Sequence, residues 1–191
     1  MLSNRQEQIL EVSIGLIDRL GIQGFTIKNL SKEIGISEPA IYRHFDSKVD
    51  ILATILEGFR QRVGRYHEQR LGLQLTAREQ LTLFFEMIFL VLADNPALIS
   101  VIFAEEIFKN EPVLSQKVME IQQINEREIS RMIAEMPLRD ELKDRPIDSL
   151  VMLLFGSVRL LARKWKFADC SFDLKAEGAQ LIQMILLMMS R

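Results

Sequence analysis

Thr26-Ile-Lys-Asn-Leu-Ser-Lys-Glu-Ile-Gly-Ile-Ser-Glu-Pro-Ala-Ile-Tyr-Arg-His-Phe-Asp-Ser-Lys48 is the stretch that decides the fold of this 191-residue chain. It predicts two short helices, over 27–34 and 38–44, with a turn between them. Apolar residues recur at helical spacing as far as Ile34, and Gly35 follows, where the left-handed conformation that ends a helix costs glycine little. Two helices joined by such a turn form a helix-turn-helix, which suggests a DNA-reading protein.

Polar residues at the helix starts support these boundaries. Thr26 precedes the first helix, and its hydroxyl is expected to accept a backbone N–H there. Ser37 precedes the second helix and Pro39 lies in its first turn, so the expected partner of the Ser37 hydroxyl is the N–H of Ala40. Ser47-Lys-Val-Asp50 has the spacing of a capping box and predicts the start of a long third helix.

The second helix has one apolar side. Ile41 and Phe45 are four residues apart and are expected to face the core. The outer side and the exposed end are left to polar and small residues, namely Glu38, Ala40, Tyr42, Arg43 and His44. Lys48, at the start of the next helix, is placed to reach a phosphate.

At these residues the chain resembles the TetR family of bacterial transcriptional repressors, whose DNA-binding domain reads roughly Thr-Val-x-x-Ile-Ala-x-x-Ala-Gly-Val-Ser-x-x-x-Leu-Tyr-x-His-Phe-x-x-Lys. The positions that match this pattern are Gly35, Ser37, Tyr42, His44, Phe45 and Lys48, and the preceding helix matches at Ile9, Leu10, Leu16, Ile17 and Gly21. The resemblance covers about the first fifty residues, and beyond them the chain shares the family's all-helical layout.

The resemblance implies a dimer that places the second motif helix of each subunit in the major groove of a half-site. It implies that the phosphate backbone is held by Thr26, Ser37, Tyr42, His44 and Lys48. It also implies that base edges are read by Lys28, Glu38, Pro39, Ala40 and Arg43, with Arg43 placed to donate to guanine and the Ala40 methyl to touch thymine. The chain departs from the family pattern at Leu30-Ser31, at Ile34 and at Glu38, whose carboxylate either repels phosphate or accepts from cytosine.

Composition limits the classes of protein. The net charge is −2, from 24 basic and 26 acidic residues, so a few placed contacts are expected rather than indiscriminate coating of nucleic acid. Hydrophobic residues make up 48% of the chain, enough for a sizeable core. The single cysteine, Cys170, cannot form an intrachain disulfide, and no cluster of Cys and His has metal-ligand spacing, so no cofactor or metal is expected.

The sequence does not favour an enzyme or a membrane protein. No nucleophile–base pair is visible, since His44 belongs to the motif and His67 has no catalytic partner nearby. Charges at the N-terminus interrupt the apolar core that a signal peptide needs, and Glu86 and Arg159 break the longest apolar runs. We therefore expect a cytoplasmic protein with no membrane partner.

The whole chain has helical periodicity and nothing alternates like a strand, so the expected fold class is all-α. Residues that end or cap helices mark the breaks, which gives about nine helices, over 3–20, 27–34, 38–44, 47–70, 77–94, 96–109, 112–136, 146–168 and 173–190. We expect a helix-turn-helix DNA-binding domain over 1–46 and a helical ligand-binding and dimerisation domain over 47–191.

The last two helices carry more apolar surface than one neighbour can cover. The residues that we expect in a dimer interface are Val151, Leu154, Val158, Leu161 and Trp165 on 146–168, and Leu181, Ile185 and Met188 on 173–190. Leu153, Gly156, Leu160 and Phe167 form a second stripe on the first of these helices, and Ile182, Leu186 and Met189 form one on the second. Gly156 and Gly178 would permit close approach of two subunits. The alternative is that both helices are wholly internal.

The middle helices would hold a small ligand if there is one. Their aromatic residues could enclose an apolar molecule, although such residues are more often plain core. Glu106 and Asn125 fall on apolar faces and are candidate anchors, with hydrogen-bonded interior residues as the alternative. The candidate ligand-binding residues are Phe85, Phe89, Phe103, Glu106, Asn125 and Phe155.

These features together predict a DNA-binding transcriptional regulator, a dimeric repressor that a small, largely apolar effector releases from a palindromic operator. The effector would move the helix that starts at Lys48 and so change the separation of the two recognition helices. The alternatives are a nucleoid- or division-associated DNA-binding protein that needs no effector, and a transcriptional activator with the same fold.

Overall fold

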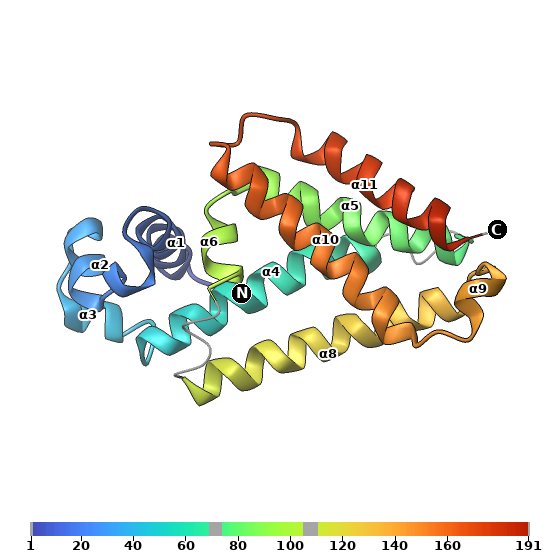
Figure 1. Cartoon of the computed structure of the whole chain (residues 1–191). Coiled ribbons are helices and arrows are strands. Elements are labelled where there is room, and N and C mark those ends of the chain that lie inside the picture. The colour runs from blue at the N-terminus through green and yellow to red at the C-terminus, as the bar shows by residue number, and fades with distance from the viewer. Residues whose placement is uncertain (1, 69–73, 105–110, 191) are drawn as a thin grey trace. The chain divides into compact units, whose positions relative to one another are not determined.

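Figure 1 shows the computed structural model of the chain, which describes residues 2–68, 74–104 and 111–190. In these residues the regular elements are ten helices, and the one strand-like contact is an isolated antiparallel bridge between Leu138 and Ser190. The all-α prediction is confirmed.

Contacts divide the chain into two compact units. Unit 1 consists of Met1–Arg60 and Pro96–Glu120, and unit 2 consists of Gln61–Asn95 and Ile121–Arg191. The domain boundary expected at residue 46 falls inside unit 1, whose core includes the buried side chains of Ile51 and Leu52 from the following helix.

Unit 1 holds the N-terminal helices. Its elements are α1 (Asn4–Gly24), α2 (Ile27–Ile34), α3 (Glu38–Tyr42), the first part of α4 (Lys48–Glu68), α6 (Leu98–Ile102) and the first part of α8 (Pro112–Ala134). A capping box starts α1: the Ser3 hydroxyl accepts from the Gln6 N–H, and the Gln6 side chain accepts from the Ser3 N–H. The helix continues past the expected end at residue 20 but is kinked at Gly21, whose φ is 66°.

Unit 2 holds the rest of α4 and α8 together with α5 (Ala77–Asp94), α9 (Asp140–Lys143), α10 (Ile147–Phe167) and α11 (Leu174–Met189). α5 packs closely on α11, where Gly178 faces the ring of the fully buried Phe89. A capping box between Thr76 and Glu79 starts α5, and the Asp173 carboxylate caps α11.

Most helix boundaries lie within a few residues of the prediction, and those of 27–34 and 77–94 coincide with it. The helix expected over 96–109 is seen as α6 over Leu98–Ile102, and residues 105–110 lie outside the described part of the chain. The single turn of α9 was not predicted, since it occupies a stretch between two prolines that had the composition of a loop. None of the described helices has both the length and the apolar character needed to cross a membrane.

Candidate DNA-binding surface

The turn between α2 and α3 has the geometry of a Schellman motif. Gly35 has φ 77° and ψ 34°, and its N–H lies 3.2 Å from the Lys32 carbonyl oxygen. The N–H of Ile36 donates to the Ser31 carbonyl oxygen at 3.0 Å. This pair of bonds satisfies carbonyls that the end of a helix otherwise leaves without partners. The predicted role of Gly35 is confirmed.

The two predicted helix caps differ in the structure. The Thr26 hydroxyl accepts from the backbone N–H of Asn29 at 3.1 Å, as expected for an N-cap residue. The Ser37 hydroxyl makes no cap hydrogen bond, so its expected bond from Ala40 is wrong. The Ala40 N–H instead donates to the backbone carbonyl of Ser37 at 2.9 Å, because α3 starts with a tight turn. The Ser37 hydroxyl is exposed.

α3 rests on a buried apolar base. Ile41 is 0% exposed and Phe45 is 4% exposed, which confirms the predicted inner side. α3 ends at Tyr42, and the chain continues as a turn in which two N–H groups donate to the Ile41 carbonyl, that of His44 at 2.9 Å and that of Phe45 at 3.1 Å. Arg43 and His44 therefore follow the helix instead of belonging to it.

The outer side of this motif presents the residues expected to meet DNA. Those that are exposed are Thr26, Lys28, Ser37, Glu38, Pro39, Tyr42 and Arg43, and those that are half-buried are Ala40, His44 and Lys48. Tyr42 keeps half of its surface exposed although it is a large side chain. All of these residues belong to unit 1.

Lys48 points toward the end of α1. Its Nζ lies 3.4 Å from the Ile22 carbonyl oxygen and 5.3 Å from the centre of the Phe25 ring. Burial lowers the pKa of Lys48, and the nearby Glu111 carboxylate opposes that effect. Lys48 thus fastens the kinked end of α1 to the start of α4, and its contact with a phosphate stays a prediction.

Three further hydrogen bonds fix the motif. The Gln6 side chain donates to the His44 carbonyl oxygen at 3.3 Å, which joins the start of α1 to the end of the motif. The Asp50 N–H donates to the Ser47 hydroxyl at 3.1 Å, as the capping box predicted, but the Asp50 carboxylate accepts from the N–H of Asp46. The Gln6 contact was missed, since nothing in the local sequence signals a bond across 38 residues.

The candidate ligand residues do not gather within one unit. Phe85 and Phe89 are fully buried, and the Phe85 ring meets the ring of Phe155 edge to face at 5.8 Å, as core aromatics do. Phe103 belongs to unit 1 and Asn125 to unit 2, and both are half-buried. Glu106 lies outside the described residues.

An open groove of about 850 Å³ lies on unit 2 between α5 and α11. None of the candidate ligand residues lines it. Its lining consists of Leu75, Arg78, Glu79, Thr82, Leu83, Gln180, Gln183, Met184 and Leu187. Within the described ranges, no three His, Cys, Asp or Glu side chains gather where they could hold a metal ion.

The residues expected in a dimer interface are mostly committed to the protomer. Those that are buried in it are Val151, Leu154, Val158, Trp165 and Ile185; Leu161 and Leu181 are half-buried, and Met188 is exposed. Gly178 is covered by Phe89 of the same chain, whereas nothing lies within 4 Å of a Cβ built on Gly156. A buried side chain has no surface left to offer a partner, so these helices direct their first apolar stripe into their own core.

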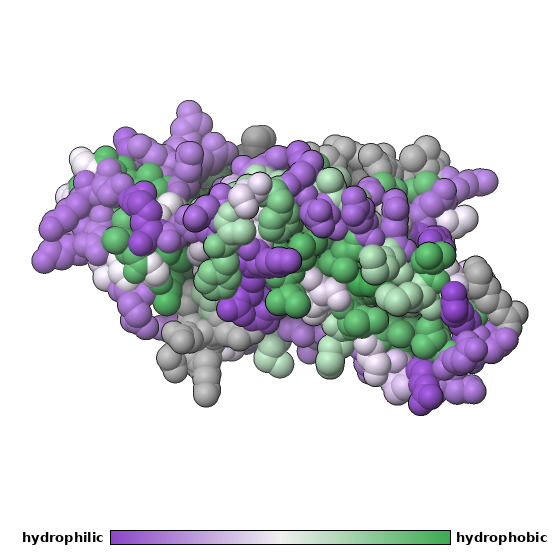
Figure 2. Space-filling view, turned by 45° about the horizontal axis from the view of Figure 1, so that its top comes forward, coloured by the Kyte–Doolittle hydropathy of each residue, from purple (hydrophilic) through white to green (hydrophobic). Residues whose placement is uncertain are grey.

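A different stripe of large apolar residues remains exposed on the same helices. Its members are Met152, Leu153, Leu160 and Phe167 on α10 and Met184, Leu187 and Met188 on α11, and we call it the outer stripe. Figure 2 shows hydrophobic residues gathered on the surface in the region of these helices. Apolar patches of this kind on a protein surface mark sites of association.

The tight turn, the short exposed helix and the buried base beneath it define a helix-turn-helix DNA-binding protein. Residues 9–55 match the family model described as bacterial regulatory proteins, tetR family. The N-terminal domain of this chain belongs to that family, and the chain as a whole has the fold of its DNA-binding regulators.

Similar proteins extend the comparison over the whole chain. A nucleoid occlusion factor SlmA from Vibrio atlanticus (strain LGP32) is 24% identical over 174 residues, which are 90% of this chain and 88% of that protein. The TetR family transcriptional regulator PfmR from Thermus thermophilus is 19% identical with a TM-score of 0.78, covering 96% of this chain and 100% of the other. The transcriptional regulator FadR from Bacillus subtilis, in complex with stearoyl-CoA, is 21% identical with a TM-score of 0.76, covering 94% and 96%. At these identities the two structures establish a shared fold.

Proposed function

We propose that this protein is a dimeric transcriptional repressor that binds a palindromic operator and that a small, largely apolar effector releases. The observation that carries the proposal is the exposed outer side of α3 above the buried Ile41. A helix whose inner side packs on the core and whose outer side is exposed to solvent can enter a major groove without unfolding the domain. Such a regulator acts on chromosomal DNA in the cytoplasm and needs no enzymatic activity.

The outer stripe supports the dimer. Two copies that bury their outer stripes against each other would form a four-helix interface of the kind first expected from the sequence, but of the residues expected there only Met188 would take part. Gly156 lies on α10 with four residues of the outer stripe, and the open space around it lets a partner helix approach closely. The groove on unit 2 shares Met184 and Leu187 with this stripe, so a partner on the stripe would border the groove.

The effector is supported more indirectly. The similar fold of FadR from Bacillus subtilis was solved with stearoyl-CoA, a ligand with a long apolar chain. Unit 2 of this chain carries an open groove that both apolar and polar residues line. Aromatic residues of unit 2, among them the fully buried Phe85, belong to its core and not to this groove. We therefore include release by an apolar molecule in the proposal.

A second function competes with repression. A relative that matches along 90% of this chain is a nucleoid occlusion factor, which favours a DNA-binding protein that acts on the nucleoid without an effector. A genome-wide binding map separates the two. A repressor should occupy few palindromes near promoters, whereas a nucleoid protein should occupy many sites along the chromosome.

The DNA-binding proposal itself is tested by selection from a random duplex library with the purified full chain. We expect a palindromic site, and we expect Tyr42→Ala and Arg43→Ala to weaken binding to it by about 5- to 100-fold. Lys143→Ala is the control, because it removes an exposed positive charge from α9 in unit 2. Failure to select any site, or equal binding by all three variants, would overturn the proposal.

A further inference from the structure

Unit 1 contains a segment that is far in sequence from the DNA-binding motif. This segment, 96–120, includes α6 and the first part of α8, and it is separated from the N-terminal part of the unit by residues that belong to unit 2. The N-terminal part, 1–60, is covalently joined to unit 2 through α4 alone. Segment 96–120 has two further connections to unit 2, one after Asn95 and one within α8 before Ile121.

Apolar packing holds this segment in unit 1. Val101 and Leu114 are 0% exposed, and Leu98 and Ile99 are buried next to Val101 in the chain. α6 packs on α1, the first helix of the DNA-binding domain. Apolar burial is strong but not directional, so it does not by itself fix the register of one helix on another.

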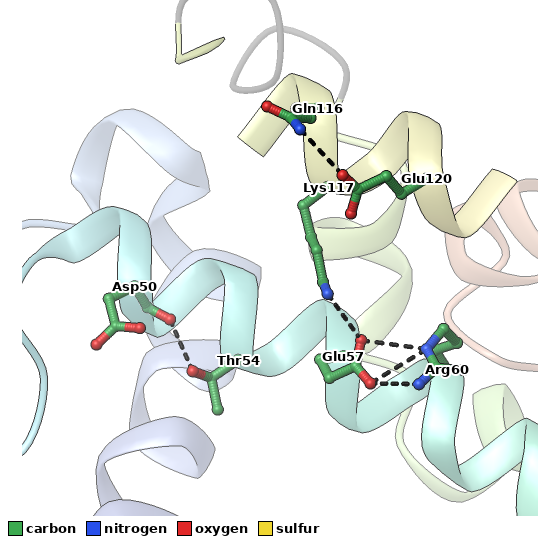
Figure 3. Close-up of polar contacts among 7 residues, drawn as sticks. All are labelled: Asp50, Thr54, Glu57, Arg60, Gln116, Lys117 and Glu120. Atoms are coloured by element: carbon green, nitrogen blue, oxygen red, sulfur yellow. Dashed lines mark hydrogen bonds and ion pairs between the residues drawn. The ribbon is translucent and has the colours of Figure 1, made fainter. Parts of the chain in front are cut away.

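Two polar contacts fix the register of this segment on the N-terminal part of unit 1. The Ser100 hydroxyl donates to Asp18 Oδ1 at 2.7 Å and joins α6 to α1. Lys117 Nζ lies 3.3 Å from Glu57 Oε2 and joins α8 to α4 (Figure 3). Figure 3 shows the Glu57 carboxylate between Lys117 and Arg60, whose Nε donates to it at 3.1 Å.

The Glu57 site is partly shielded from water. The Glu57 side chain is 24% exposed, and those of Lys117 and Arg60 are each 37% exposed. Arg60 is one turn from Glu57 on the same helix and holds the carboxylate in place, while Lys117 comes from a helix that begins more than forty residues later. The Lys117 pair is therefore the contact of this cluster that joins distant parts of the chain.

We propose that Glu57 and Lys117 are positioning residues for operator binding. With the pair closed, a polar contact as well as apolar packing fixes α8 on α4. With the pair open, segment 96–120 keeps its apolar packing and the Ser100–Asp18 hydrogen bond, but α8 is less firmly fixed on α4. In a dimer the pair would then restrict the separation of the two recognition helices. The inference rests on the proposed function, because it assigns a control point to the same DNA-binding surface.

The experiment measures binding of the full chain to its selected operator, to a single half-site, and to operators with altered half-site spacing. The variants are Lys117→Met, Glu57→Gln, the double variant, and Lys117→Arg. Lys143→Met is the matched control, because it also removes one lysine and one surface ion pair, with Asp140, but that pair lies within a single turn of α9. Thermal unfolding of each variant reports on folding.

We expect Lys117→Met to weaken binding to the operator by about 2- to 25-fold, since an exposed ion pair contributes a factor of roughly 1.5 to 5 per subunit and the dimer uses two. The preference for one half-site spacing should broaden, and binding to the half-site should match that of the Lys143→Met control. Lys117→Arg keeps the ion pair and should bind like the wild type. The double variant should bind no more weakly than Glu57→Gln alone, because both changes open the same contact.

Two outcomes would overturn the inference. One is that Lys117→Met and Lys143→Met bind the operator series alike, and the other is that the losses of Lys117→Met and Glu57→Gln add in the double variant. If the wild type selects no DNA, the proposed function fails as a whole. If the wild type binds its operator and Lys117→Met leaves the spacing preference unchanged, the positioning role fails while the proposed function stands.

Discussion

Gly178→Ala should destabilise unit 2, because the new methyl group has no room. A Cβ built on Gly178 lies 2.6 Å from both Cε2 and Cγ of Phe89, and closer still to Cδ2. The Phe89 ring is 0% exposed, so it cannot swing into solvent to make space. Either the ring leaves its position or α11 moves away from α5.

The magnitude follows from two opposing effects. Overpacking a core by a methyl group costs about 3 kcal/mol when the neighbour is as rigid as a buried ring. Replacing glycine by alanine inside a helix returns about 1 kcal/mol. The net loss is therefore about 2 kcal/mol, which should lower the Tm by about 4–8 °C for a chain of this size.

The assay is thermal and urea unfolding of Gly178→Ala, Gly64→Ala, Phe89→Leu and the double variant Gly178→Ala/Phe89→Leu. Gly64→Ala is the control, since it makes the same change inside α4, also in unit 2, at a site where nothing lies within 4 Å of the new Cβ. It should raise the Tm by about 1–4 °C. Phe89→Leu should cost less in the Gly178→Ala background than in the wild type, because the smaller side chain makes room for the methyl group. Equal stability of Gly178→Ala and the wild type, or strict additivity with Phe89→Leu, would refute this account of the α5–α11 contact.

Three other predictions follow from the structure. Thr26→Ala should lower the free energy of unfolding by about 1 kcal/mol, whereas Ser37→Ala should change it by less than about 0.5 kcal/mol because its hydroxyl caps nothing; equal losses in urea unfolding would contradict the assigned caps. Hydrogen bonds from Thr76 lower the pKa of Glu79 below its ordinary 4.5, so the stabilisation by this carboxylate should be present above that value and be lost as the pH falls through the lowered one. The difference in the free energy of unfolding between wild type and Glu79→Gln should accordingly shrink in acid. A difference that stays constant from neutral to acidic pH would contradict the role assigned to the Glu79 carboxylate. Leu160→Glu, on the outer stripe, should yield folded monomers in sedimentation experiments, and a dimer of unchanged affinity would exclude that stripe from the interface.

Helix positions were predictable from the sequence because local residues specify them. Thr26 and Gly35 each act within one turn of a helix, and the structure shows both in their expected roles. α9 and the kink at Gly21 were not predicted, because both lie where helix-ending residues made a loop or an end the simpler interpretation.

The assignment of apolar faces was less predictable for a physical reason. Val151 and Leu160 both lie on apolar stripes of α10, and periodicity shows that two faces exist without showing which one meets the chain's own core. Only packing decides that, and it buries Val151 and leaves Leu160 exposed. In the same way Gly178 could serve a subunit contact or an internal one, and the position of Phe89 makes it internal.

The charges on the DNA-binding motif set a limit on how it holds a duplex. Residues 26–48 include four basic and three acidic side chains. Lys48 points toward the end of α1, and Arg19, outside this stretch, pairs with Glu33 at 2.7 Å. Few cations therefore remain for phosphates. We expect the hydroxyls of Thr26 and Tyr42, and backbone N–H groups near the start of α2, to carry part of that contact. With roughly three phosphates neutralised per subunit, the slope of log K against log salt should be about −5 for the dimer. A slope twice as steep would require cations from elsewhere in the chain, and the site would then extend beyond the motif.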